Sequence, residues 1–281
     1  MPDIWGLAAI AAKFLLYLGV LTSTGTVFAA VIFQVVNIKA FTMVFAVVGM
    51  IGAVASFGLG GAALTGDASG MMDLEMLGLL WDTPVGTALS YRLVGLALLI
   101  AGLLFGRPGI WMSSLGGVLA LWSFVAVGHV PNRDILWLNA LLFVHLGGIA
   151  LWIGILAPLK GLAKERAILE AAELGDRFGR LAAVFVPLLI LAGIVMSYVL
   201  VGSISALIGT GYGQALIAKV IVVSFLMGLG ALNKLRIVPQ LMVGEANAAL
   251  HLSRSISFEW MAVVLILFVT AILTSVLNLP S

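Results

Sequence analysis

The sequence predicts an all-α, polytopic membrane helix bundle with eight transmembrane helices, on three observations. Of its 281 residues, 63% are hydrophobic and 9% are charged, whereas soluble domains carry roughly 25% charged residues. Apolar runs long enough to cross a bilayer, about 20 residues each, recur along the whole chain. Most cationic residues fall in every second break between these runs, which is the pattern that orients membrane helices.

The apolar runs, read between polar breaks, place the expected spans along the chain. They cover residues 5–34, 41–63, 84–105, 111–128, 135–158, 181–202, 214–232 and 256–277. The break at 159–180 is rich in Ala, Glu and Leu, which predicts a cytoplasmic helix lying along the membrane. Because no Ser/Gly-rich linker, low-complexity tract or clean repeat divides the sequence, we expect a single transmembrane domain over residues 1–281.

The distribution of Lys and Arg predicts which ends of the spans face the cytoplasm. One set of breaks carries ten of the fourteen cationic residues, namely Lys39, Arg107, Lys160, Lys164, Arg166, Arg177, Arg180, Lys234, Arg236 and Arg254. The alternate set carries Arg133 among the acids Asp3, Asp67, Asp73, Glu75, Asp82 and Asp134. By the positive-inside rule the first set is cytoplasmic, so both termini are expected in the periplasm.

Composition and motifs exclude several classes of chemistry. The chain has no Cys, which excludes thiolate metal sites, disulfides and iron–sulfur clusters and leaves His, Met and carboxylates as metal ligands. The sequence contains no Walker A motif and no Ser with a convincing His and Asp partner set, so we do not expect an enzyme. The net charge of only +2 gives no reason to expect a nucleic-acid partner.

His145 is the main candidate functional residue, because it lies in the middle of the uncharged stretch 136–156, LWLNALLFVHLGGIALWIGIL. It is about ten residues from the outer end of its span, hence roughly 15 Å deep. An imidazole at that depth usually faces a partner, a ligand or water, and Gly147 and Gly148 allow a neighbouring helix to approach closely. The interpretation as a metal or cofactor ligand stands beside a plainer one, a neutral imidazole bonded to a helix carbonyl or a serine.

Further candidate metal ligands are one more histidine and four methionines. His129, in VGHVPNRD at the outer end of the fourth span, is a second candidate ligand or simply a solvated side chain. Thioethers suit Cu(I), and the candidates are Met72 and Met76 in the outer loop, with Met50 and Met196 within spans. Packing of apolar helices is the alternative role for each methionine.

Three cations lie within expected spans on the cation-poor outer side: Lys13, Arg92 and Lys219. Long cationic side chains can snorkel to the interface, but two functional interpretations remain open. The cations pair with the outer acidic loop at 64–83, which carries Asp67, Asp73, Glu75 and Asp82, and fix it as a lid. Alternatively they hold an anionic ligand, such as a haem propionate or a lipid head group.

The C-terminal part of the sequence resembles the copper resistance protein D family (CopD/PcoD), in detail over about residues 128–277 and more loosely before. The residues that carry the resemblance are Arg177-Phe178, Gly193, Tyr212-Gly213, Lys219, Leu232-Asn233, Arg236 and Pro239. Gly128-His129, the segment HLGGIALWIG around His145 and the segment TPVGTALSYRL with Arg92 are also similar to that family. By position, the resemblance assigns His129, His145, Arg92 and Lys219 to matching motifs, whereas the methionines are not assigned.

The resemblance implies a copper-handling protein of the bacterial inner membrane, one that takes up a copper ion, Cu(I) or Cu(II). We therefore expect a multi-pass protein, surrounded by membrane lipid, that transports copper from the periplasm toward the cytoplasm. The family also implies a small periplasmic copper carrier (CopC-like) as a separate partner. The alternative function is a haem- or quinone-binding membrane redox protein, with His145 and either His129 or Met196 as axial ligands. A structural subunit or chaperone of another complex is a third.

Overall fold

The computed structural model describes residues 4–128, 130, 135–165, 167–245 and 247–279, and this part of the chain is helical without strands. Eight helices are long and apolar enough to cross a membrane, in agreement with the eight expected spans. They are α1 (Ile4–Phe33), α2 (Lys39–Thr65), α4 (Pro84–Leu104), α5 (Gly106–Ala126), α6 (Leu136–Lys164), α7 (Ile168–Val201), α9 (Gly211–Leu232) and α11 (Ala248–Ser275).

Five short elements join the long helices. The loop after α2 folds into η1 (Ala68–Met71) and α3 (Leu74–Trp81), and α8 (Ile204–Gly209) lies between α7 and α9. At its end, α9 continues through one π-helical turn, η3 (Asn233–Ile237), into α10 (Val238–Met242). The helix that precedes the eighth membrane span thus changes from α-helical to π-helical at Asn233.

The prediction of a separate cytoplasmic helix over 159–180 is wrong. α6 continues to Lys164 and α7 already begins at Ile168, so this segment extends two spans beyond the expected ends. The reason is packing, because small and apolar residues of the 159–180 segment contact other helices of the protein instead of lying on the membrane surface. The α-carbon of Gly175, for example, lies so close to α10 that an added Cβ would be 2.8 Å from Val238 Cγ2.

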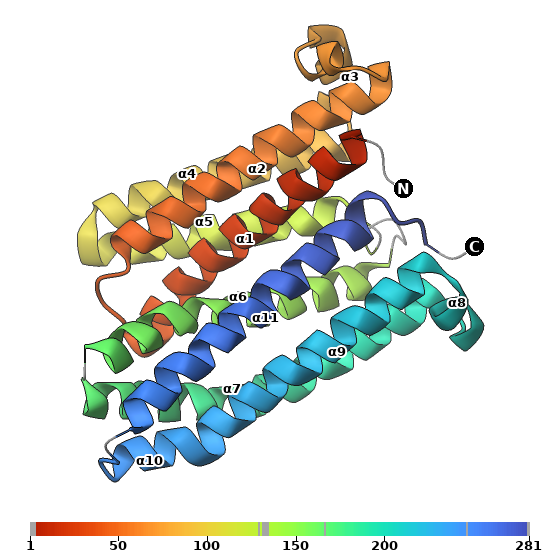
Figure 1. Ribbon diagram of the computed structural model, residues 1–281. Helices are drawn as coiled ribbons and strands as arrows, with labels where there is room; N and C mark the ends of the chain where they lie inside the picture. Colours follow the sequence, from red (N-terminus) through yellow and green to blue (C-terminus); the bar gives the residue numbers. More distant parts are fainter. Residues whose placement is uncertain (1–3, 129, 131–134, 166, 246, 280–281) are drawn as a thin grey trace.

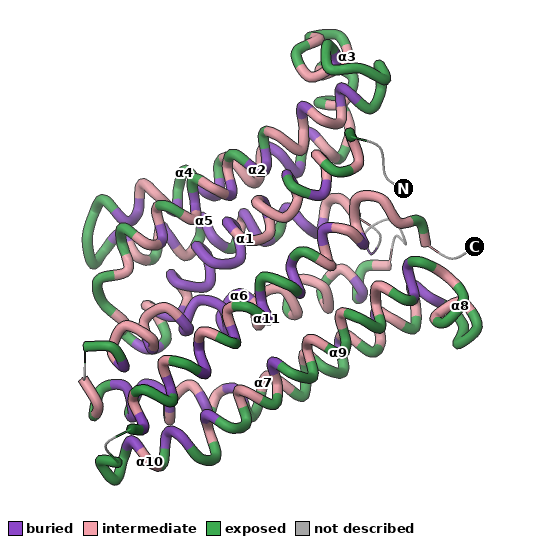
Figure 2. Tube along the Cα trace, in the orientation of Figure 1, coloured by how far each residue is buried: buried purple, intermediate pink, exposed green. Residues whose placement is uncertain are grey.

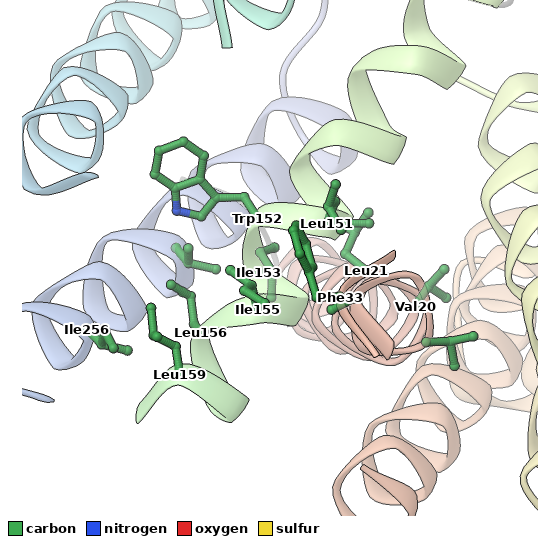
Figure 3. Packing of buried hydrophobic residues seen from close by; sticks show 14 of the residues in the cluster. Val20, Leu21, Phe33, Leu151, Trp152, Ile153, Ile155, Leu156, Leu159 and Ile256 are labelled. Atoms are coloured by element: carbon green, nitrogen blue, oxygen red, sulfur yellow. The ribbon is translucent and has the colours of Figure 1, made fainter. Parts of the chain in front are cut away.

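α1 lies at the centre of the bundle, with α2, α4 and α5 on one side and α6, α7, α9 and α11 on the other (Figure 1). Its contact with α6 is unusually close, because a Cβ at Gly25 would lie 1.7 Å from the carbonyl oxygen of Ala150. Such small-residue contacts replace the hydrophobic effect as the means of joining helices inside lipid. Figure 3 shows the result, with Leu151 and Ile155 of α6 beside α1 and Trp152 directed away from it.

Burial is least along α7 and α9 and greater in the other long helices (Figure 2). The exposed apolar side chains of α7 and α9 suit contact with lipid. The start of α1 and the end of α11 lie at the same end of the bundle as α3 and α8, while α10 lies at the opposite end (Figure 1). This agrees with an even number of spans, and the membrane side of each end stays a prediction.

Candidate functional site

His145 lies on α6 against α7, where small residues admit its ring. The imidazole Cε1 is 3.8 Å from the position that a Cβ at Gly193 would occupy. One turn along α6, a Cβ at Gly148 would lie 2.7 Å from Leu189 Cδ2, so the glycine allows that leucine to pack against the helix. Gly148 and Gly193 thus make room at this level for the two bulky groups, Leu189 and the imidazole.

The Nδ1 atom of His145 is buried and, within the described residues, has no hydrogen-bond partner. The ring also interacts with the backbone of Leu189 and lies within range of repulsion from the Lys219 ammonium on α9. A buried polar atom without a partner costs roughly 1–3 kcal/mol, so native proteins seldom leave one unexplained. The free nitrogen therefore marks the place where a ligand atom or an ordered water would be bound.

Met196 lies on the same α6–α7 interface as His145. It follows Gly193 by three residues, which places it on the same face of α7 and about 4.5 Å nearer the end of the bundle that carries α3 and α8. Its side chain is 8% exposed and packs with Leu138, Ala192 and Leu200. The structure thus brings two of the sequence-predicted ligands, an imidazole and a thioether, to one helix pair.

The other three methionines lie elsewhere. Met50 belongs to α2, on the far side of α1 from α7 (Figure 1), and packs against the main core. Met72 is 87% exposed and Met76 is half-buried, both in the segment that joins α2 to α4. These positions separate the outer-loop pair from His145.

The acids of the outer loop have local structural roles. Asp67 Oδ1 accepts a 2.7 Å bond from the Ser69 backbone N–H, and Asp73 Oδ1 accepts from Glu75 and Met76 at 2.9 and 3.3 Å. They cap η1 and α3 respectively, as Asp does at helix N-termini. The hydrogen bonds from Ser69 lower the pKa of Asp67. Glu75 and Asp82 are exposed.

The intramembrane cations have partners other than these acids. Lys13 Nζ donates to the backbone carbonyl of Thr274. Arg92 Nε donates to Ser123 Oγ at 3.1 Å, and its guanidinium lies 5.3 Å from the Phe124 ring centroid. In the part of the chain that the structure describes, the ion pair found is Arg180–Asp176 at one helix surface. The described residues show no ion pair between Lys13, Arg92 or Lys219 and the loop acids.

His129 lies outside the described residues, so its place relative to His145 stays a prediction. Among the residues that are described, no group of three or more His, Asp and Glu side chains is arranged to hold a metal ion. Within the described residues, a metal site centred on His145 would need thioether sulfur, main-chain oxygen or solvent among its ligands.

Sequence reasoning missed a buried carboxylate at Glu259 on α11, which is 3% exposed. Its Oε2 accepts a 2.9 Å bond from Trp152 Nε1, and its Oε1 accepts a 2.5 Å bond from Asn233 Nδ2. Glu259 lies inside the expected span 256–277, and an acid within a span is by itself a sign of function. The position of this acid in an apolar run was therefore a signal available in the sequence.

The indole that holds Glu259 is fixed by aromatic contacts with α7. Its ring centroid lies 5.5 Å from Phe178 and 6.4 Å from Phe185, both in edge-to-face geometry. Asn233, the other donor, is the first residue of the π-helical turn. π-helical turns occur frequently at functional sites, and this one turns an amide toward the carboxylate.

Comparison with known families and proteins identifies the chain. The model of the copper resistance protein D-like N-terminal domain matches residues 1–134, and that of copper resistance protein D matches residues 172–273. Copper transport protein CutJ of Bacillus subtilis (strain 168) is 30% identical over 184 residues, 63% of this chain and 32% of CutJ. Copper resistance protein D of Pseudomonas syringae pv. tomato is 28% identical over 205 residues, 66% of each protein.

The chain thus spans about a third of the length of CutJ and about two thirds of that of the Pseudomonas protein. No solved structure matches the chain. The names of these relatives suggest copper resistance or transport rather than catalysis, and they give no support to the haem or quinone alternative. With eight apolar helices and two family models matched in order along the sequence, the chain belongs to the copper resistance protein D family.

Proposed function

We propose that this protein is a copper-binding protein of the bacterial inner membrane that moves copper from the periplasm toward the cytoplasm. The family and its named relatives support copper handling. The assignment of particular residues depends on the buried Nδ1 of His145, which has no hydrogen-bond partner among the described residues. We assign His145 as the copper ligand of the membrane interior and Met196 as the neighbouring thioether.

The charge and donors around His145 favour Cu(I) over Cu(II). Imidazole and thioether are ligands that copper accepts, and the soft thioether selects the cuprous ion. The ammonium of Lys219 lies within range of the His145 ring, and it repels a doubly charged ion about twice as strongly as a singly charged one. Lys219 thus acts as a filter against divalent cations at this level of the bundle.

The exposed loop between α2 and α4 is the proposed place of first capture. Met72, between η1 and α3, is 87% exposed, and Met76 lies four residues further along, in α3, with Asp73 between them in sequence. Both methionines lie in the segment that joins α2 to α4, outside the packed core of the bundle. Their sulfurs are therefore suited to accept copper from a periplasmic carrier of the CopC-like kind. His129 remains a candidate ligand between the loop and His145, and Met50, across α1 from α7, remains a candidate for a separate copper position.

The test replaces His145 and measures copper directly. Cells that produce His145→Ala are expected to accumulate less copper than cells with the unchanged protein, and the purified variant should bind less Cu(I). His251→Ala is the matched control, because His251 is an exposed imidazole on α11. If His145→Ala, at equal protein level, takes up and binds as much copper as the control, the assignment is wrong.

A further inference from the structure

We propose that Glu259 is a proton-binding site that loses its proton when copper binds at His145. In that step the O–H bond of the carboxylic acid breaks and the proton passes to water, leaving a carboxylate in the bundle. The link between copper binding and proton release rests on the proposed function. Proton binding by Glu259 is argued from the contacts of Glu259 alone.

The partners of Glu259 satisfy the side chain in both protonation states. The Trp152 indole N–H is a donor only, and it bonds Oε2, which accepts in the carboxylate and in the neutral acid alike. Asn233 faces Oε1 through its amide, which has both a donor and an acceptor. A turn of the amide plane exchanges an N–H donated to the carboxylate for a carbonyl that accepts the O–H of the acid.

Two further oxygen atoms near this carboxylate lack partners. Asn233 Oδ1 and Ser255 Oγ are buried and, within the described chain, without hydrogen bonds, and Ser255 precedes Glu259 by one turn of α11. These two unpaired oxygens, one on a bonded partner of Glu259 and one a helical turn before it, are suited to a proton and a water molecule. They are hard ligands, which suit a proton or an alkali cation better than Cu(I).

None of the charged groups on the elements packed on α11 forms an ion pair with Glu259 in the described residues. On α6, Lys160 is the cation nearest in position, and it donates to Ser257 Oγ at 2.8 Å, two residues before Glu259. Also on α6, His145 faces α7 and Lys164 is exposed. On η3, the stem of Lys234 packs on Gly179 and Arg236 is exposed, and on α11 itself His251 and Arg254 are exposed. Tyr212 lies at the start of α9, about 31 Å along that helix from Asn233. On α1, Lys13 and Tyr17 both bond Thr274, about 22 Å along α11 from Glu259. α10 carries no titratable side chain, and Lys219 of α9 precedes Asn233 by about 21 Å along the helix.

No ion pair involving Glu259 is present in the described chain. A bare carboxylate inside a bilayer is expensive, so its charge must be balanced by a bound proton or by a cation that arrives nearby. A copper ion at His145 is such a cation. Trp152 follows His145 by seven residues on the same face of α6, about 10.5 Å along the helix, and α7 touches both residues.

The first experiment tests proton binding without copper. Infrared difference spectra of the purified full chain in lipid are recorded across a pH series, in the carbonyl region of protonated carboxylic acids. The protein should show a band that disappears as pH rises, and Glu259→Gln should abolish it. Glu170→Gln, at an exposed acid of α7, should leave it unchanged. Asn233→Leu, which removes the acceptor of the acid proton, should move the midpoint of the transition.

The second experiment tests the link to copper. Addition of Cu(I) to the weakly buffered protein should release protons, and Glu259→Gln should release about one proton fewer per bound copper while binding still occurs. Equal release by both proteins, or a carboxylic band that Glu259→Gln leaves intact, overturns the inference. So does a band that responds to sodium concentration and not to pH. If Cu(I) does not bind at all, the proposed function fails while the infrared result still decides proton binding.

Discussion

Trp152 Nε1 on α6 donates a 2.9 Å hydrogen bond to Oε2 of Glu259 on α11, 107 residues further along the chain. Both side chains are buried. The bond therefore joins the helix that carries His145 to the last span through a polar contact in the apolar interior. Hydrogen bonds of this kind specify how helices meet when hydrophobicity alone does not.

We expect Trp152→Phe to destabilise the protein through Glu259. Phe preserves an aromatic ring but has no N–H, so the buried Oε2 loses its donor, a change that costs about 1–3 kcal/mol. In a Glu259→Leu background, which has no acceptor for the indole N–H, the same change should cost less. Unfolding of the four proteins of this double-mutant cycle measures the difference. Strictly additive effects would mean that the two side chains are not energetically coupled.

Met196→Leu should weaken Cu(I) binding while preserving the fold. Leu fills nearly the same volume but lacks the sulfur, and loss of one ligand should reduce affinity on the order of tenfold, about 1.4 kcal/mol. Competition titration with a Cu(I) chelator measures this. Met261→Leu, at a methionine that is 63% exposed on α11, should bind copper as the unchanged protein does. Equal affinities for the two variants would remove Met196 from the site.

Gly25→Ala should disturb the packing of α1 on α6. Its added methyl group would lie 1.7 Å from the Ala150 carbonyl oxygen, so the helices must separate, at a cost of roughly 1–3 kcal/mol or more. Thermal unfolding in detergent should show a lower midpoint. Gly228→Ala on α9, where nothing lies within 4 Å of the new atom, should be neutral or slightly stabilising because Ala favours helix. A similar midpoint for both variants would contradict the close contact.

The outer loop should lose structure in acid at Asp67. The hydrogen bonds from Ser69 lower the pKa of this carboxyl in the folded state. Its stabilising contribution is therefore fully present above the ordinary aspartate pKa and is lost as pH falls through the lowered value. Carbon NMR of labelled aspartate should follow this titration. Ser69→Ala keeps the backbone N–H but removes the hydroxyl, so it should move the Asp67 midpoint upward, and an unmoved midpoint would show that the hydroxyl does not contribute to the shift.

Much of the architecture could be predicted because hydropathy and charge act locally along the chain. The sequence predicts the span that contains His145 at 135–158, and α6 covers Leu136–Lys164, one residue later at its start and six later at its end. The error at 159–180 arose where a segment rich in Ala and Leu had two possible partners, the membrane surface or α10, and sequence does not distinguish them. The caps at Asp67 and Asp73 were open to prediction, since each precedes a short helix.

The site was harder to predict, because contacts between side chains of different helices depend on how each helix is rotated about its axis. His145 and Met196 lie at the same interface because the faces of α6 and α7 that carry Gly148 and Gly193 are turned toward each other. Arg92 finds Ser123 on α5, 31 residues away, a partner that no local pattern indicates. Glu259 differs from these residues, because an acid inside an expected span indicates a functional position even when its partners are unknown.

The most direct test of the account is an anomalous difference map at the copper edge, from crystals of the protein loaded with Cu(I). The account predicts a peak at the α6–α7 interface, within bonding distance of His145 Nδ1 and with Met196 as its thioether neighbour. A peak at Met72 and Met76 alone, with His145 Nδ1 bonded to water or main chain, would contradict a copper site inside the membrane.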